Sequence, residues 1–144
     1  MISQTEIKDF DKKFDVVSAF VEHKGRILLL HRQDHKPQGD TWGVPAGKVD
    51  EGENFLEALV REVQEEIGLL SKKDNYISLG SYYVRYRDYD FLYHSYRVIL
   101  KDEPKLALNP KEHKDFRWVE PKDALGFNLI QDEDMCIKWA YGIK

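Results

Sequence analysis

The sequence predicts an α/β sandwich built on a mixed β-sheet. Three observations lead to this prediction: extended segments occur in pairs that read as hairpins, one amphipathic helix lies between the pairs, and another ends the chain. Hairpins place antiparallel strands side by side, whereas a doubly wound parallel sheet needs a crossover helix between consecutive strands. A chain of 144 residues is close to the commonest domain size, so we expect one domain over 1–144.

The first pair of strands follows a polar N-terminal segment. Residues 1–14 lack an apolar run, and we expect a mobile or loosely docked arm there. β-Branched and aromatic residues dominate DVVSAFVE (15–22), which predicts a strand, and RILLLHR (26–32) predicts a second, largely buried strand after a short turn. The composition of the segment 33–41 then predicts a loop.

The central helix is delimited by signals at both ends. A short extended segment at 42–49, interrupted by glycine and proline, precedes it. Asn54, with Glu57 three residues later, gives a start that is similar to a capping box, and Gly68 provides the stop. We therefore expect a helix over 54–67.

The second half of the chain predicts another hairpin and the last helices. The segments 76–86 and 91–100 alternate between apolar and polar residues on either side of the turn sequence RDYD, which predicts a long hairpin. A further short strand is expected at 115–120. Pro121 suits the first turn of a short helix, and 132–141 reads as a final amphipathic helix.

Composition limits the classes of partner. The formal net charge is −4, whereas non-specific binding to nucleic acid needs a basic face, so we expect no nucleic-acid partner. No apolar run approaches the roughly 20 residues of a membrane span, and nothing resembles a signal peptide, so we expect no membrane partner and a cytoplasmic location. The single cysteine, Cys136, allows no internal disulfide.

The glutamates at the end of the expected helix need an explanation. On a helical wheel, the apolar side chains form one stripe that we expect to face the core: Leu56, Leu59, Val63 and Ile67. Glu62, Glu65 and Glu66 form another stripe, which includes the small Ala58. Like charges four residues apart cost roughly 0.2–0.5 kcal/mol per pair, and carboxylates in the last turn meet the negative end of the helix dipole. Two interpretations stay open at this point: a solvated acidic face, or a site for a divalent cation such as Mg²⁺.

A longer pattern around these glutamates favours the cation site. The segment 47–69, GKVDEGENFLEALVREVQEEIGL, resembles the Nudix box and fills each of its defining positions: Gly, five residues, Glu, seven residues, then REV-x-EE-x-GL. The preceding WGVPAGK and the order of the expected strands are similar to the MutT-like branch of that family. The resemblance implies a Nudix-type α/β/α sandwich with a mixed sheet.

In the Nudix family the box holds Mg²⁺ or Mn²⁺ against a diphosphate, which implies a set of metal ligands in this chain. The set is Glu62 and Glu66 as principal ligands, Glu65 as a third, and the backbone carbonyl of Ala46. Glu53 and Arg61 would hold these carboxylates in place, since a guanidinium can bind carboxylates in a fixed fork geometry. For Arg61, an ordinary surface ion pair is the alternative.

A carboxylate from outside the box often completes a Nudix site. The segment 111–118, KEHKDFRW, has the MutT-like spacing of Lys-Glu followed by Trp six residues after the Glu. This spacing implies that Glu112 is a further metal ligand or the general base. Asp115 is the competing candidate, and a loop glutamate without a chemical role is the alternative interpretation of Glu112.

The resemblance also suggests residues that would contact the substrate. Arg32 ends a strand where MutT-like enzymes place a nucleotide-contacting arginine, and Lys48 follows the box glycine, where it would meet phosphate. Tyr86 occupies the position of a tyrosine that is typical of diadenosine polyphosphate hydrolases. Asn128 and Gln131 precede the last helix, where this branch often reads the base. Plain surface charges are the alternative for Arg32 and Lys48, and packing on the sheet is the alternative for Tyr86.

The implied reaction is the Mg²⁺-dependent hydrolysis of a nucleoside diphosphate linked to another moiety, catalysed by a Nudix pyrophosphohydrolase. For a nucleoside triphosphate the products would be the monophosphate and pyrophosphate, and this substrate class is our first expectation. A dinucleoside polyphosphate hydrolase and a non-catalytic nucleotide-binding Nudix module are the alternatives. The expected partner is a small-molecule nucleotide, and a homodimer is compatible with the family.

Overall fold

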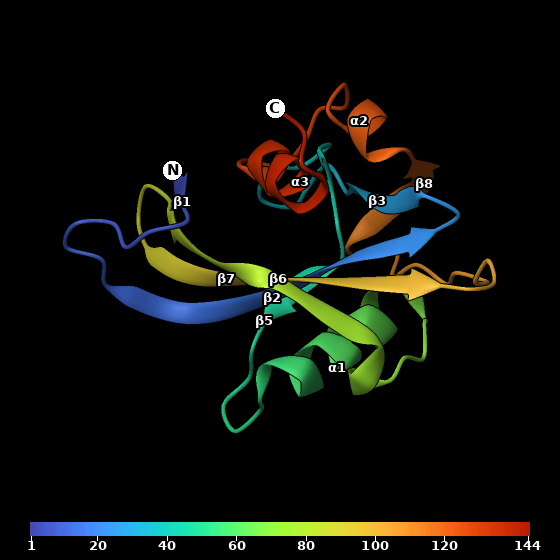
Figure 1. Ribbon diagram of the computed structural model, residues 1–144, viewed down its shortest axis with the longest axis horizontal. Helices are drawn as coiled ribbons and strands as arrows, with labels where there is room; N and C mark the ends of the chain where they lie inside the picture. The colour runs from blue at the N-terminus through green and yellow to red at the C-terminus, as the bar shows by residue number, and fades with distance from the viewer.

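An eight-stranded mixed sheet lies between helices on both of its faces in the computed structural model, which describes residues 1–144. Helix α1 (Phe55–Ile67) covers one face, and helices α2 (Pro121–Ala124) and α3 (Glu133–Tyr141) lie on the other (Figure 1). The predicted α/β/α sandwich is therefore confirmed. None of these helices combines the length and the apolar composition that crossing a bilayer requires.

The strands run in the order β1-β6-β7-β2-β3-β4, with β5 beside β2 and β8 beside β3. Their bounds are β1 (Ile2–Ser3), β2 (Lys12–His23), β3 (Arg26–Arg32), β4 (Trp42–Gly43), β5 (Ala46–Lys48), β6 (Tyr76–Arg85), β7 (Asp90–Leu100) and β8 (His113–Val119). A 3₁₀ turn, η1 (Lys73–Asn75), precedes β6. Among the strand pairs, only β2 and β7 are parallel, and the others are antiparallel, so the sheet is mixed as predicted.

Strand β2 organises the sheet because three other strands pair with it. It runs parallel to β7 along nearly its whole length. On its other side, β2 pairs with β3 only at residues 22–23, beside the turn, and with β5 at residues 16–18. The two strands of the first predicted hairpin therefore separate after their turn, and β5 lies where β3 would otherwise continue.

The central helix begins and ends where the sequence predicts. The Asn54 side chain accepts a hydrogen bond from the Glu57 N–H at 2.9 Å, and the Glu57 carboxylate accepts one from the Asn54 N–H at 3.4 Å, which completes the capping box. Gly68 ends the helix with a φ of 70°, a left-handed conformation that costs glycine little. The predicted second hairpin and the final helix are also present, as β6, β7 and α3.

The N-terminal segment 1–14 makes contacts that its composition does not predict. Strand β1 pairs with β6, and the N-terminal amine donates to the Arg85 carbonyl at 2.9 Å. Ile7 is buried, and β2 begins at Lys12 instead of residue 15. Parts of the expected mobile or loosely docked arm therefore belong to the sheet. Isolated apolar residues carry this docking, and they leave no periodic signal in the sequence.

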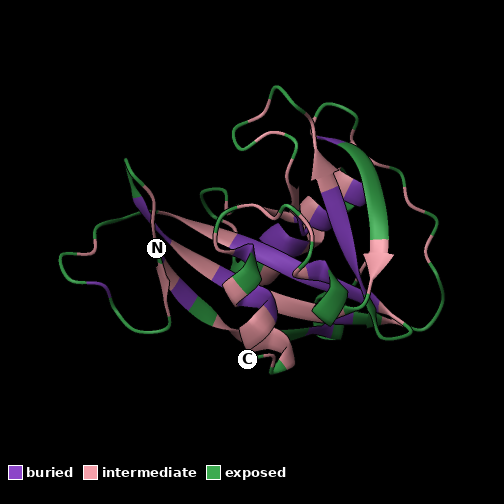
Figure 2. Ribbon diagram, turned by 90° about the horizontal axis from the view of Figure 1, so that it is seen from above, coloured by how far each residue is buried: buried purple, intermediate pink, exposed green.

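Two apolar clusters fill the space on either side of the sheet. One lies under α1 and includes Leu59 and Val63, and the other lies under α3 and includes Phe20 and Ile137. Buried residues accordingly gather at the centre of the molecule (Figure 2). The helical wheel placed Ala58 among the glutamates, but Ala58 is fully buried in the cluster under α1. The apolar stripe of α1 is thus wider than we expected.

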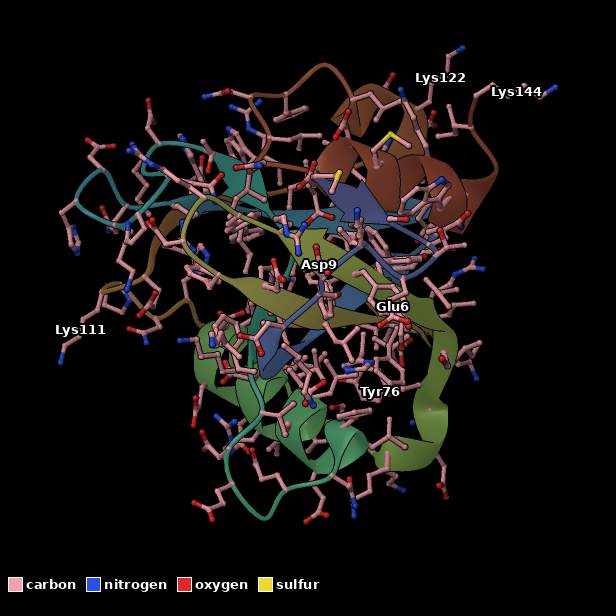
Figure 3. All side chains as sticks on the ribbon, turned by 90° about the vertical axis from the view of Figure 1, so that its left-hand side faces the viewer. Glu6, Asp9, Tyr76, Lys111, Lys122 and Lys144 are labelled. Atoms are coloured by element: carbon pink, nitrogen blue, oxygen red, sulfur yellow. The ribbon has the colours of Figure 1, made fainter.

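Exposed lysines and the buried Tyr76 show two ways in which polar groups are accommodated. Lys111, Lys122 and Lys144 are exposed and point away from the ribbon (Figure 3). Tyr76, in contrast, is 8% exposed and packs in the cluster under α1, and its hydroxyl shares a 2.7 Å hydrogen bond with the hydroxyl of Ser71. This arrangement satisfies the phenol without exposing its ring.

A bidentate ion pair closes the hairpin between β6 and β7. Arg85 donates through Nε and Nη2 to the two carboxylate oxygens of Asp90, at 2.8 and 2.9 Å, and the Asp11 N–H donates to the same carboxylate at 2.8 Å. The Arg85 guanidinium and then the Asp11 N–H lower the pKa of Asp90 to about 2. The pair fixes the base of the turn that carries Tyr86.

We expect Asp90→Asn to lower the melting temperature by a few degrees at neutral pH and to have almost no effect near pH 2. The folded-state pKa of about 2 is below the roughly 3.9 of an unfolded chain. The carboxylate therefore stabilises the fold above pH ~4, and this contribution is lost as the pH falls towards 2. Thermal unfolding from pH 2 to pH 7 measures it, and a pH-independent difference from the wild type would contradict the assignment.

Candidate active site

The carboxylates of Glu62 and Glu66 lie against the backbone of β5. The Ala46 N–H donates to Glu66 Oε2 at 2.9 Å. Beside it, Gly47 has no side chain, and a Cβ there would overlap the carboxyl group of Glu62. Glycine at this position therefore leaves room for the Glu62 carboxyl group against the strand, next to that of Glu66 from the following helical turn.

The surroundings of Glu66 make its negative charge costly. Removal of its carboxyl group from water raises the pKa of Glu66 well above the ordinary value, and the charges of Glu62 and Glu112 raise it further. The Ala46 N–H and the Arg32 guanidinium act in the opposite direction. Burial raises the pKa of Glu62 as well, although Arg61 partly offsets this effect. Acidic side chains from two segments of the chain thus converge on Glu66.

Arg61 connects the loop before α1 to the carboxylates of the helix. Its Nε and Nη2 donate to the two oxygens of Glu53 at 2.8 and 2.9 Å, and its Nη1 donates to Glu62 at 2.8 Å and to Glu65 at 3.3 Å. Nη2 also donates to the Lys48 carbonyl at 3.1 Å. The Arg61 guanidinium, together with the Asp50 N–H, lowers the pKa of Glu53 to about 2. These bonds place Glu53 and Arg61 where the resemblance expects them, although their role in holding metal ligands stays a prediction.

Glu112 reaches the same region from the segment between β7 and β8. Its carboxylate pairs with the Lys36 ammonium at 3.0 Å, and its backbone carbonyl accepts from the Gln33 N–H at 3.0 Å. Its charge acts on Glu66, whereas Asp115 is exposed on β8 and accepts from the N–H of Phe116. The charge of Glu112 is therefore among those that raise the pKa of Glu66, which favours Glu112 over Asp115 as the carboxylate from outside the box.

A cavity of about 100 Å³ opens beside Glu66 and extends between the β6–β7 hairpin and the start of α3. Its walls are mainly apolar. Five residues that the sequence singled out line it: Arg32, Ala46, Glu66, Tyr86 and Gln131. Two members of the expected metal set and three of the expected substrate residues therefore share one cavity, whereas Glu62, Glu65 and Glu112 do not line it.

Two predicted substrate residues lie outside this cavity. Lys48 is exposed, and its ammonium lies over the ring of Phe14, 4.2 Å from the ring centroid. Asn128 is exposed, and its backbone carbonyl accepts from the N–H of Trp42 at 2.9 Å. The structure gives Asn128 a structural contact beside β4 and no contact with the cavity.

Other residues of the cavity are not evident from the sequence. Gln38, in the loop 33–41, does not line the cavity but supports it, because its Oε1 accepts from the N–H of Gln131, which does, at 2.8 Å. Asp132 and Glu133 line the cavity at the start of α3. Acidic residues in the first turn of a helix are ordinary partners of the helix dipole, so their type and position gave no signal of burial.

The carboxylates and the backbone carbonyl expected as ligands are oxygen donors of the type that binds a hard divalent cation. Their side chains, however, are not arranged around a common point. No group of three or more His, Cys, Asp or Glu side chains in the structure is arranged to hold a metal ion. The carboxylates of Glu62 and Glu65 accept hydrogen bonds from Arg61 instead. The Glu66 carboxylate accepts one from the Ala46 N–H. Carboxylates that repel one another beside a backbone carbonyl are ligands of the type that Mg²⁺ prefers. The ligand set stays a prediction.

Comparison with known proteins gives one family and several relatives. A family model described as the NUDIX domain matches residues 12–139. The chain is 31% identical over 118 residues to the CTP pyrophosphohydrolase of Escherichia coli strain K12, an alignment that covers 82% of this chain and 84% of that protein. It is 28% identical over 119 residues to the 8-oxo-dGTP diphosphatase of Buchnera aphidicola subsp. Schizaphis graminum, covering 82% of this chain and 85% of that one.

A solved structure shows the same fold. The MutT NUDIX hydrolase from Burkholderia pseudomallei superimposes with a TM-score of 0.75 at 23% identity, and the match covers 88% of this chain and 96% of that one. The fold and the box sequence therefore agree in pointing to one family.

We expect Arg61→Lys to lower the free energy of unfolding by about 1–2 kcal/mol, since solvent screening limits the energy of this partly exposed network. A lysine ammonium keeps the charge but cannot form the fork to Glu53 and reach Glu62 at the same time. Urea unfolding measures the loss. The control is Arg26→Lys, an exposed arginine at the start of β3, and an equal loss in both variants would contradict a structural role of the network.

Proposed function

Since this chain belongs to the Nudix hydrolase family and is therefore a hydrolytic enzyme, we propose that it cleaves nucleoside triphosphates into a nucleoside monophosphate and pyrophosphate, with Mg²⁺ as cofactor. One observation carries this proposal. Glu66, from the acidic end of α1, lines the same cavity as Tyr86 and Gln131, which belong to elements on the other side of that cavity. A ligand with a phosphate chain at one end and a ring at the other would match this division.

Two of the relatives that cover most of this chain support a nucleoside triphosphate. Two proteins that align with more than four-fifths of this chain are named for the hydrolysis of CTP and 8-oxo-dGTP, which are both nucleoside triphosphates. Their names do not agree on the base. The phosphate chemistry is thus the part of the proposal that the relatives support together.

The carboxylates next to β5 would hold the metal: Glu62 and Glu66, with Glu65, Glu112 and the Ala46 carbonyl. When bound, Mg²⁺ supplies positive charge to phosphate oxygens and lowers the pKa of a water molecule. Arg32 lines the cavity beside Glu66, and its guanidinium would bind the phosphate chain. Glu112 would accept the proton of the attacking water, because it lies near Glu66 and its loop position leaves it partly accessible.

Hydrolysis of dinucleoside polyphosphates is the second candidate. Tyr86 lines the cavity, and its ring lies 5.7 Å from that of Tyr89, which is 40% exposed. The aromatic surface thus continues from the cavity to the outside, where a second base would stack. Equal turnover of a dinucleoside tetraphosphate and of triphosphates would favour this candidate.

We expect Glu66→Gln to lower turnover by about 100-fold or more without loss of stability. Removal of residues that only support metal ligands costs 10- to 100-fold, so loss of a ligand charge should cost at least as much. The amide still accepts from the Ala46 N–H, and the repulsion from Glu62 and Glu112 disappears. Steady-state kinetics and thermal unfolding test both parts. Glu103→Gln, at an exposed carboxylate away from the site, is the control, and wild-type turnover in the Glu66 variant would refute the metal assignment.

Removal of metal should abolish hydrolysis and leave the fold intact. We expect a screen of nucleoside triphosphates with Mg²⁺ to yield monophosphate and pyrophosphate in equal amounts, and excess EDTA to stop the reaction. The core clusters do not include the acidic site, so the melting temperature should change by only a few degrees. Unfolding by EDTA would instead indicate a metal-stabilised structural domain, and binding without hydrolysis would indicate a non-catalytic module.

A further inference from the structure

Three polar side chains from neighbouring strands form a chain of hydrogen bonds on the sheet, beside the start of α1. Ser81 on β6 lies opposite His94 on β7, and its hydroxyl oxygen is 2.6 Å from His94 Nδ1. On the other side of the ring, His94 Nε2 is 2.8 Å from Oδ1 of Asp15 on β2. A hydroxyl, an imidazole and a carboxylate are therefore joined in the order that activates the nucleophile of serine hydrolases.

The carboxylate of Asp15 fixes where the protons of this chain lie. Burial acts against its charge, yet the hydrogen bonds from His94 and Lys12 hold the pKa of Asp15 below its ordinary value, so the group is ionised at pH 7. An ionised carboxylate only accepts hydrogen bonds, so the proton of a neutral His94 ring lies on Nε2. Nδ1 then carries the lone pair and accepts from the Ser81 hydroxyl. His94 is thus oriented as a base towards Ser81, with Nδ1 in the role that Nε2 has in serine proteases.

Packing holds the imidazole in this position. His94 is only 5% exposed, and the ring of Phe55, the first residue of α1, stacks on it with the ring centroids 3.9 Å apart and an angle of 23° between the planes. The Asp15 carboxylate is held in turn by the Lys12 ammonium at 2.9 Å. Because the base has little freedom to rotate, its alignment with the hydroxyl costs little additional entropy.

Ser81, in contrast to the buried base, is exposed to solvent. Strand β1 pairs only with Tyr83 and Val84 of β6, so residues 76–82 form an open edge of the sheet. Alternate backbone N–H groups of such an edge have no strand partner and can donate to negative charge that develops on a substrate oxygen. Phe55 is 37% exposed, so its ring offers apolar contact area beside the same histidine.

We propose that Ser81 is the nucleophile of a second active site, which hydrolyses small carboxylic esters with an apolar acyl group. Ser81 Oγ attacks the carbonyl carbon and forms a new C–O bond, while its proton passes to His94 Nδ1. His94 returns that proton to the leaving alcohol as the ester C–O bond breaks, which leaves an acyl-serine. A water molecule, deprotonated by His94, then releases the acid and restores the hydroxyl. Neither Ser81 nor His94 lines the cavity beside Glu66, so this activity does not depend on the function proposed above.

A fluorophosphonate probe tests the nucleophile directly, because an activated serine attacks its phosphorus and fluoride leaves. We expect peptide mass spectrometry to locate the phosphonyl group on Ser81 of the intact chain, and the probe to stop the hydrolysis of p-nitrophenyl butyrate. Ser78 is the matched control, since it is an exposed serine on the same strand without a hydrogen bond to a histidine. Ser78→Ala should leave labelling and ester hydrolysis unchanged, whereas Ser81→Ala should abolish both. No labelling of Ser81, or labelling of Ser78 to the same extent, would overturn the proposal.

Asp15→Asn distinguishes a catalytic network from a merely structural one. An asparagine amide that donates to Nε2 moves the ring proton to Nδ1, so the ring can no longer accept the proton of Ser81. We expect the rate of labelling to fall by about 100-fold or more, the usual contribution of a general base, while triphosphate hydrolysis is retained. Labelling of this variant at the wild-type rate would overturn the proposal, since the serine would then react without the base.

Excess EDTA separates this proposal from the metal-dependent reaction. We expect labelling of Ser81 and hydrolysis of p-nitrophenyl butyrate to continue in EDTA at the rates seen with Mg²⁺, because the three residues carry out the steps without a metal. Both readouts use the wild-type protein and hold even if no triphosphate is hydrolysed. Loss of ester hydrolysis in EDTA would overturn the proposal of an independent site.

Discussion

The close approach of α1 to β5 is the constraint on which the site depends. A side chain at Gly47 would occupy the position of the Glu62 carboxyl group, so glycine there leaves this carboxyl group its place against the strand. Beside it, the Ala46 N–H reaches Glu66. The capping box at Asn54 and the left-handed Gly68 fix the ends of the helix, and the wide apolar stripe fixes its rotation. Three independent local signals thus orient one pair of carboxylates.

The branching of the sheet at β2 decides which segments surround these carboxylates. Beyond the turn at residues 22–23, β5 takes the place of β3 beside β2, while β3 pairs with β4 and β8. On its other edge, β2 pairs with β7 of the β6–β7 hairpin. The start of α3 completes the cavity. The topology therefore brings together residues that are far apart in the chain, such as Arg32, Glu66 and Glu133.

Local signals explain what could be predicted from the sequence, and long-range contacts explain what could not. The helix from Asn54, the alternating strands and the box glutamates all depend on neighbours within a few residues, so their positions follow from periodicity and capping. Strand β1 depends on a partner 80 or more residues away in β6, and no pattern in the polar arm indicates it. Burial of Ala58 likewise depends on how deeply the helix sinks into the sheet. Asp132 and Glu133 read as ordinary helix-start acids until the fold covers them.

The two glutamates that line the cavity, Glu66 and Glu133, differ in the charge state that their surroundings favour. Glu66 lies among other carboxylates and near Arg32, an arrangement that becomes favourable only when further positive charge is supplied. Glu133 lies in a mainly apolar part of the chain, where burial raises the pKa of its carboxyl group to about 8, so it is more stable as a neutral acid at pH 7. One end of the cavity is therefore suited to a highly charged group with its counter-ion, and the other to an uncharged polar ring. A nucleotide has the same division between a charged phosphate chain and an uncharged base, and the proposed function assumes that its phosphates lie at the Glu66 end.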